Sequence, residues 1–448
     1  MTVDLVIVGA GPAGVSAAIE ATERGLSVVV MDENPASRGR FRQALETRGA
    51  RDADDEEGLE ILRAFGACGA TAHHGASVWA IEPDGSVYFS HNGAVRMVRG
   101  QRVLLATGAA ERPLPIPGWT QPGVMTVGAA QIALKTSGLV PDGATWIAGQ
   151  GPLLLLYAVQ ALRAGGRLAG VLDLSDRRQR WKAVRHLPLA SRGIGELRKG
   201  VRWRREIARA GIPWLPASDL RAEGDGALRR IVFQTGGRSR TEPATLLLLH
   251  DGVVPSLQLT RALGCDHRWD TAQQCWHPAS NEWGQTSVPH VFVAGDGGGI
   301  IGAKAATLAG RLTALGIAHD LGRIDRATRD SAAAPSRRAQ ARQLAIRPLL
   351  DTLYAHRPVS LSDETLVCRC EEVTAGHIRH AAALGCLGLN QLKAFTRCGM
   401  GPCQGRMCGT TAAEVLAAAR GVATELIEPL RTRFPTKPLT VGELAGLD

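Results

Sequence analysis

Apolar runs of strand length alternate with helical stretches along the first two-thirds of the chain. Residues 3–8 form a run typical of a buried parallel strand, and a second run at 26–31 ends in an acidic pair. The same order returns at 146–148, where a glycine-containing turn and a helix lead to a strand ending near Asp173. Two such β–α–β openings predict an α/β fold with two Rossmann-like dinucleotide-binding domains.

The pattern predicts five parts. A first nucleotide-binding domain is interrupted by an inserted second one, and then come a helical linker, a small α-rich cysteine module and an extended tail. The tail contains a proline-rich stretch at 434–438, which disfavours a helix and is expected to lie over a neighbouring surface. The predicted boundaries are 1–115 with 240–325, 116–239, 326–360, 361–420 and 421–448.

Composition narrows the class of protein. The chain has 448 residues and a net charge of +10, but its arginines are spread over predicted helices, which favours a solvated surface over nucleic-acid binding. The first residues enter a strand at once, without the basic and apolar regions of a signal peptide. The longest apolar runs are far too short to span a bilayer. We therefore expect a cytoplasmic protein without a transmembrane segment.

The first turn has the Gly-x-Gly-x-x-Gly spacing of a dinucleotide-binding loop. The first glycine permits the tight turn, the second lets a pyrophosphate approach the backbone, and the third lets helix and strand pack closely. The helix N-terminus then offers free N–H groups to the phosphates, and an acid after the next strand binds ribose hydroxyls. The residues predicted to bind the cofactor here are Gly9, Gly11, Pro12, Ala13, Gly14, Asp32 and Glu33.

Two later segments indicate which dinucleotide is bound. Residues 104–108 are an apolar strand that stops at a glycine, and residues 291–297 are another that ends in an acid. In this order, the three motifs resemble the glutathione-reductase-like flavoproteins. The resemblance implies FAD, with Asp296 bonded to its ribityl chain and a helix N-terminus pointing at the flavin. The further cofactor-binding residues it predicts are Ala106, Thr107, Gly108, Gly295, Asp296 and Gly302.

One stretch departs from that pattern. Where these flavoproteins usually carry two glycines close to the cofactor, this chain has Ser37–Arg38–Gly39–Arg40. Arg40 is a candidate cofactor ligand, because it would either pair with the pyrophosphate or clash with the cofactor. NAD or a structural adenine nucleotide therefore stays open as an alternative to FAD.

The second glycine loop is degenerate. Gly149-x-Gly151 is followed by Pro152, which removes one N–H, and by leucines where the third small residue should stand. We interpret it as a structural copy and not as an NAD(P)H site. No Cys-x-x-Cys or Cys-x4-Cys pair accompanies the flavin motifs, which excludes a dithiol disulfide reductase.

Six of the nine cysteines lie between Cys368 and Cys408. A Cys-x-Cys pair followed, after a helix, by a Cys-x4-Cys pair amid glycines favours an iron–sulfur cluster over structural zinc. This module resembles the bacterioferritin-associated-ferredoxin-like [2Fe–2S] domain, which implies Cys368, Cys370, Cys403 and Cys408 as ligands. Spacing alone does not reject Cys398, which we interpret as a buried packing thiol, and Cys386 as a core residue.

Further strings, including residues 109–113, 117–124 and 250–255, resemble one group of these flavoproteins. The group comprises the FAD-binding subunits of opine oxidases, hydrogen cyanide synthase and amino-acid (proline or hydroxyproline) dehydrogenases. The resemblance implies an oxidoreductase subunit that is active only with a D-amino-acid-oxidase-like FAD subunit, joined in some complexes by a small third one. It also implies an interfacial flavin, often FMN, and electron transfer through the cluster to quinone or another respiratory acceptor. That acceptor would bring a cytoplasmic complex to the inner membrane.

Two other functions remain open at this stage. The chain would be a self-contained NAD(P)H-dependent flavin and iron–sulfur reductase if the second loop bound nicotinamide. It would be a non-catalytic scaffold if the nucleotide were purely structural. No Ser/His/Asp set, metal-water ligand set or pair of catalytic carboxylates stands out, so no catalytic residue is assigned. His250 and Lys135 are candidates to face a flavin, but a satisfied strand-end histidine and an ordinary surface lysine explain them as well.

Overall fold

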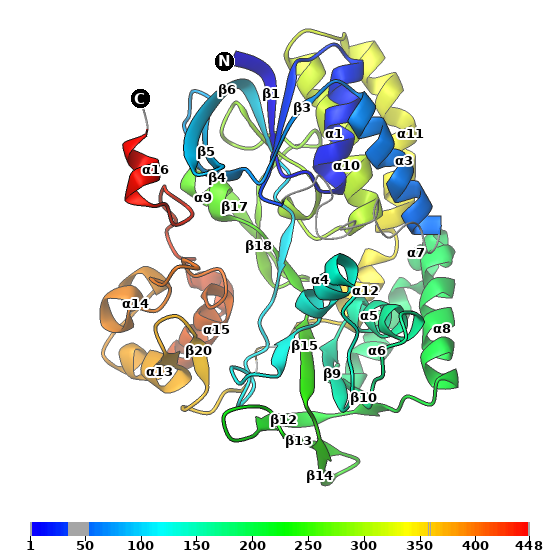
Figure 1. The fold of residues 1–448 in the computed structure, drawn as a ribbon, viewed down its shortest axis with the longest axis vertical. Coiled ribbons are helices and arrows are strands. Elements are labelled where there is room, and N and C mark those ends of the chain that lie inside the picture. The colour runs from blue at the N-terminus through cyan, green and yellow to red at the C-terminus, as the bar shows by residue number, and fades with distance from the viewer. Residues whose placement is uncertain (1, 35–52, 357, 359, 447–448) are drawn as a thin grey trace.

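The computed structural model describes residues 2–34, 53–356, 358 and 360–446, and it has the α/β fold that the sequence predicts. Figure 1 shows one α/β unit around β1 and β6, a second around β9 and β15, and a small helical module around α13–α15 beside them. No helix among these described residues is long and apolar enough to cross a membrane.

The first unit is built on a seven-stranded sheet in the order β3-β2-β1-β6-β5-β4, with β19 paired to β6. Strands β3, β2, β1, β6 and β19 run parallel, while β5 and β4 form antiparallel hairpins beyond β6. The strands are β1 Thr2–Val8, β2 Val28–Asp32, β3 Thr71–His74, β4 Ser77–Ile81, β5 Ser86–His91, β6 Ala94–Leu105 and β19 Val291–Val293. The helices are α1 Pro12–Glu23, α3 Ala53–Ala67 and α10 Ala303–Asp320, and the 3₁₀ turn is η3 Gly295–Gly297.

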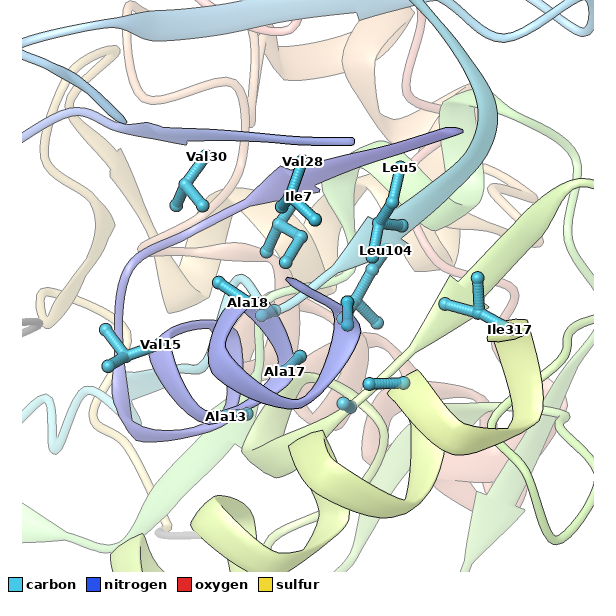
Figure 2. Close-up of a cluster of buried hydrophobic side chains, with 14 of the residues drawn as sticks. Leu5, Ile7, Ala13, Val15, Ala17, Ala18, Val28, Val30, Leu104 and Ile317 are labelled. Carbon is cyan, nitrogen blue, oxygen red and sulfur yellow. The ribbon is translucent and has the colours of Figure 1, made fainter. Parts of the chain in front are cut away.

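Small residues let α1 lie close to both the sheet and α10. Figure 2 shows Ala17 and Ala18 of α1 beneath Ile7 and Leu104, with Ile317 of α10 at the side. A Cβ on Gly310 would lie 2.0 Å from the Ala13 carbonyl oxygen, so the two helices nearly touch. Because β1, β2, β6 and β19 are parallel, the turns after them meet at one edge of the sheet.

The second unit holds a five-stranded parallel sheet in the order β11-β10-β9-β15-β8 and an antiparallel meander β12-β13-β14. β15 pairs with β9, although the sequence boundaries put this strand in the first unit, because an apolar run does not reveal which sheet it joins. The strands are β8 Val124–Thr126, β9 Thr145–Gln150, β10 Gly170–Asp173, β11 Trp214–Pro216, β12 Ser218–Glu223, β13 Arg230–Thr235, β14 Arg238–Pro243 and β15 Leu246–Asp251. The helices are α4 Val127–Ser137, α5 Pro152–Arg163, α6 Arg177–Ala183, α7 Leu187–Ala190 and α8 Ile194–Arg209, with 3₁₀ turns η1 Val184–His186 and η2 Ser191–Gly193.

Short elements join the two units. β7 pairs with β16 in the connection between the sheets, and β17 pairs with β18. Their bounds are β7 Ala109–Glu111, β16 Val253–Pro255, α9 Gln258–Ala262, β17 His267–Asp270 and β18 Cys275–Pro278. The predicted linker contains two helices, α11 Arg326–Leu344 and α12 Arg347–Leu353. Ala333 of α11 is fully buried in a cluster with α10 residues, so this segment packs on the first unit instead of standing free.

The C-terminal module has its own core around the cysteines. Thr374 caps α13, because its Oγ1 accepts a hydrogen bond from the His377 N–H at 3.3 Å. The tail crosses back to the first unit, where the Thr436 N–H donates to the Trp79 carbonyl at 2.8 Å, and it ends in a short helix that was not predicted. The elements are β20 Leu366–Cys368, β21 Val373–Thr374, α13 Ala375–Ala383, α14 Leu389–Thr396, α15 Gly409–Arg420, η4 Thr424–Leu426 and α16 Val441–Ala445.

Candidate functional site

The first glycine loop follows β1 at the shared sheet edge. A Cβ on Gly14 would lie 1.8 Å from the Gly9 carbonyl oxygen, so Gly14 is required for the close packing of α1 on the loop. A Cβ on Gly11 would meet nothing within 4 Å, because this residue faces a cavity at the N-terminus of α1. That open, N–H-rich surface suits the pyrophosphate of a dinucleotide.

The acidic pair after β2 divides into two roles. Asp32 is nearly buried, and its carboxylate accepts hydrogen bonds from the Ala10 N–H at 2.6 Å and from the Asn34 N–H at 2.8 Å. It thereby ties the glycine loop to the end of β2 and still lines the cavity, as ribose binding requires. Glu33 is more exposed and forms an ion pair with Lys437 of the tail.

The two accessory motifs lie at the same edge, after β6 and β19. Asp296 Oδ1 accepts hydrogen bonds from the N–H groups of Ile301 and Gly302, both at 2.8 Å, and so orders the turn that leads into α10. A Cβ on Gly295 would lie 2.9 Å from Ala13 Cβ, which brings this turn against α1. The predicted residues in this group that line the cavity are Ala106, Thr107, Gly108, Gly295, Asp296 and Gly302.

These turns border one large cavity of about 1600 Å³. Its lining combines the glycine loop, the accessory turns and apolar walls, which is the donor and shape pattern of an extended dinucleotide site. The residues present therefore fit FAD. Arg40 lies outside the described residues, so its predicted contact with the pyrophosphate stays a prediction.

The second loop retains the β–α–β geometry but differs at its third position. Leu154 is buried in the core of the second unit, where a glycine would permit closer packing. A Cβ on Gly149 would lie 1.8 Å from the His250 carbonyl oxygen, so this glycine serves strand packing. His250 Nδ1 lies 2.6 Å from Glu111 Oε1, and that carboxylate accepts a hydrogen bond from the Gly128 N–H. His250 is therefore a satisfied strand-end histidine that also lines the cavity.

Five cysteines gather in the C-terminal module. The sulfurs of Cys368, Cys398 and Cys408 all lie within 4.8 Å of one another, and all three residues are buried. Burial and the neighbouring Cys403 thiol raise the pKa of the Cys370 thiol, which places these two side by side. A Cβ on Gly401 would lie 2.2 Å from Cys370 Cβ, so the glycine-rich turn leaves room for this thiol.

Backbone N–H groups point at one of these sulfurs. Burial raises the pKa of the Cys368 thiol, while N–H donors from Gly399 and Glu371 oppose that rise. Hydrogen bonds of this kind stabilise thiolates and tune the potential of an iron–sulfur cluster. The sulfur-rich donor set and these N–H groups fit a [2Fe–2S] cluster.

Cys398 lies closer to the sulfur group than its position in the sequence indicates. Its sulfur is 4.0 Å from that of Cys408, and the hydrogen bond between these two thiols is the main cause that raises the pKa of Cys408. The turn after α14 brings Cys398 inward, which spacing along the chain does not reveal. The assignment of Cys368, Cys370, Cys403 and Cys408 as the four ligands therefore stays a prediction.

A buried charged network joins the units, and no motif in the sequence predicts it. Arg112 Nη1 donates to Glu414 Oε1 at 3.1 Å, and its Nη2 donates to the carbonyls of Gln273 and Gln274. His356 bridges two carboxylates, with Nδ1 2.6 Å from Asp251 Oδ2 and Nε2 2.7 Å from Glu414 Oε1. Burial alone would lower the pKa of His356, but the hydrogen bonds to both carboxylates raise it. The only signal in the sequence is that Arg112 and Asp251 stand at the ends of predicted strands.

Comparison with known proteins agrees with this geometry. Residues 3–310 match the family described as pyridine nucleotide-disulphide oxidoreductase, and residues 362–447 match the sarcosine oxidase A3 domain. Among solved structures, L-proline dehydrogenase from P. horikoshii superposes with a TM-score of 0.72 at 18% identity, covering 99% of this chain and 79% of that one. Thioredoxin reductase from T. acidophilum superposes with a TM-score of 0.53 at 18% identity, covering 71% and 99%. At these identities the structures show the fold alone.

Two curated relatives match nearly their whole length. The opine oxidase A-type polypeptide from Rhizobium meliloti (strain 1021) is 41% identical over 99% of this chain and 98% of its own. The HcnB polypeptide of hydrogen cyanide synthase from Pseudomonas aeruginosa is 34% identical over 99% and 98%. This chain therefore belongs to the pyridine nucleotide-disulphide oxidoreductase family, within the flavoprotein group that includes opine oxidase A subunits and HcnB.

Proposed function

We propose that this chain is the electron-transferring subunit of a multi-subunit flavoprotein that oxidises the C–N bond of an amino acid or opine. One observation carries the proposal. The cavity that begins at Gly11 also reaches Gly405 and Gly409 of the cysteine module. A dinucleotide in the first unit and a cluster in the module would then adjoin the same space, as electron transfer between them requires.

When bound, FAD accepts electrons in pairs and releases them singly, and a [2Fe–2S] cluster carries one electron at a time. The chain's own residues bind and orient these groups. Gly11 and the N-terminus of α1 would hold the pyrophosphate, Asp32 the ribose, and Asp296 the ribityl chain. Cys368, Cys370, Cys403 and Cys408 would hold the cluster, and the Arg112–Glu414 pair fixes the module on the first unit.

The relatives are named as subunits, which supports a multi-subunit enzyme. We infer that a D-amino-acid-oxidase-like FAD subunit performs the substrate oxidation, with a small third subunit in the complex and FMN at the interface. In support, the carboxylates and imidazoles identified around the cavity, such as His250–Glu111 and His356–Asp251, are already satisfied by one another. They hold the units together instead of offering a base to an amine.

We place the complex in the cytoplasm and its acceptor, a quinone, in the inner membrane. The region α6–α8 supports peripheral attachment, because its surface is rich in arginine and exposes large apolar side chains. Trp181 is 84% exposed and Ile194 48% exposed. Basic and apolar side chains together favour binding to anionic lipid.

The alternative is a self-contained NAD(P)H-dependent reductase. The buried Leu154 and the packing role of Gly149 weigh against it. Anaerobic addition of NADH to the purified chain separates the two functions. Our proposal predicts no rapid loss of flavin absorbance, whereas bleaching within seconds would favour the reductase.

Dependence on a partner tests the proposal directly. The chain should be produced alone and together with a D-amino-acid-oxidase-like subunit from the same genome, and both preparations assayed with octopine, proline and hydroxyproline and an artificial dye. We expect turnover only from the complex. Robust turnover by the isolated chain would contradict a purely electron-carrying role.

A further inference from the structure

Arg261 is a cation without a counter-charge in the cavity wall. It lies on α9, and its guanidinium stands 5.8 Å from the ring centroid of Trp276. Its Nη2 atom is buried and has no hydrogen-bond partner anywhere in the part of the chain that the structure describes. Burial lowers the pKa of Arg261 to about 10, so the side chain stays charged at neutral pH. A buried charge with an unsatisfied donor is unfavourable unless a ligand supplies the missing acceptor.

The surroundings do not supply that acceptor. The ring of His267 is held by a 2.9 Å contact between its Nε2 and Thr260 Oγ1. Burial first, and then the charge of Arg261, lower the pKa of His267 to about 4, so this neighbour is neutral at physiological pH. Trp269 and Trp276 form an edge-to-face pair with centroids 5.6 Å apart. The guanidinium therefore stands among aromatic and neutral groups.

The cavity has room for more than one ligand. Arg261, Trp269 and Trp276 all line it, together with the flavin-binding turns. Its volume of about 1600 Å³ exceeds the roughly 300–1,000 Å³ of an ordinary small-molecule site. The pyrophosphate of a flavin dinucleotide already has its own site at Gly11, where helix N–H groups face the cavity. Arg261 is thus available to a second anion.

We propose that Arg261 is the anchor of a second ligand in this cavity, an oxyanion-bearing molecule that the guanidinium binds through its buried Nη2 donor. The inference rests on the proposed function only in assuming that a flavin dinucleotide occupies the glycine loop. A phosphate monoester on a mononucleotide and the carboxylate of a small acid share this chemistry. The paired indoles beside Arg261 favour the mononucleotide, whose flat ring stacks on aromatic side chains.

The test is calorimetric titration of the full chain carrying its own FAD, using FMN, riboflavin and succinate as probes. We expect FMN to bind at least 10-fold more tightly than riboflavin, and R261Q to weaken FMN binding by about 10- to 100-fold. R261K, which keeps the charge but not the fork, should lie between them. R178Q, at an exposed arginine, is the matched control and should bind as the unmodified chain does.

The outcomes are distinct. Equal binding of FMN and riboflavin, combined with succinate binding that R261Q abolishes, assigns the carboxylate source. Binding of every probe unchanged in R261Q and R261K overturns the proposal, as does the absence of binding by any probe to the unmodified chain. Flavin and iron content are measured in the same samples. Loss of FAD or iron from the unmodified chain would count against the proposed function, whereas an Arg261 effect without it would leave the anion site standing.

Discussion

Arg112 donates a 3.1 Å hydrogen bond to Glu414, across 302 residues of sequence, and both side chains are nearly buried. Glu414 lies in α15, which begins directly after Cys408, whereas Arg112 follows β7 near the flavin turns. The pair therefore ties the helix that follows a predicted cluster ligand to the flavin-binding unit. His356 and Asp251 extend the same network into the second unit.

Removing Glu414 should loosen the module. Glu414→Ala leaves Arg112 and His356 without their shared carboxylate, and breaking a buried ion pair from one side costs about 3–5 kcal/mol. We expect the free energy of unfolding to fall by that order in denaturant titrations. Glu425→Ala, at an exposed position of the same module, is the control and should change it little. Equal effects of the two changes would contradict a stabilising role for the network.

The network should also make stability depend on pH. The folded-state pKa of His356 is raised by Asp251 and Glu414, although burial and Arg112 oppose that rise. A raised pKa means that the protonated imidazole stabilises the fold fully below its unfolded pKa of about 6.5, and that this contribution is lost as pH rises through the folded value. The difference in unfolding free energy between the unmodified chain and His356→Gln should be largest near pH 6 and shrink towards pH 9. A difference that grows with pH would refute this.

Two glycines in one loop should fail differently. Gly11→Val places side-chain atoms in the open space intended for the pyrophosphate, so the protein should fold but lose FAD. Gly14→Ala drives a Cβ against the Gly9 carbonyl, so it should destabilise the fold itself. Absorbance near 450 nm and thermal melting separate these effects. Gly66→Ala, in α3 with open space around its Cβ, is the control and should remain yellow.

Loss of Asp296 gives a related expectation at the second flavin motif. Asp296→Ala removes the acceptor for the Ile301 and Gly302 N–H groups and the predicted ligand of the ribityl chain. FAD should dissociate during gel filtration. If Gly11→Val and Asp296→Ala both retain flavin, the cofactor lies elsewhere or is not FAD.

The sequence predicted the flavin edge because its information is local. The spacing Gly9, Gly11 and Gly14 encodes a turn and a close helix contact, and the strand before it encodes the sheet. The position of β15 was missed because an apolar strand pairs equally well with either sheet. The placement of Cys398 beside Cys408 depends on how the turn after α14 folds back.

The Arg112, Asp251, His356 and Glu414 network was missed for another reason. Its members come from four separate segments, and charged residues are usually solvated. Nothing in a single sequence marks which charges become buried and meet. Only the packing of the module on the two α/β units creates this network.

The cysteine ligands can be tested as matched serine variants. Cys368→Ser, Cys370→Ser, Cys403→Ser and Cys408→Ser should each lose most iron and acid-labile sulfide, because a [2Fe–2S] cluster needs four thiolates. Cys386→Ser, outside the sulfur group, is the control for folding. Cys398→Ser is predicted to keep its iron, despite the 4.0 Å approach of its sulfur to Cys408. If it loses the cluster while Cys403→Ser keeps it, the ligand assignment is wrong.

The central claim is that electrons from amine oxidation pass through this chain's cluster. The most direct measurement is electron paramagnetic resonance of the complex with its partner subunit, frozen after anaerobic addition of an oxidisable opine or amino acid. The account predicts a reduced [2Fe–2S] signal that is absent from the Cys408→Ser complex, which should still bleach its flavin. Substrate that bleaches the flavin of the unmodified complex without any cluster signal, or zinc in place of iron in the purified chain, would contradict it.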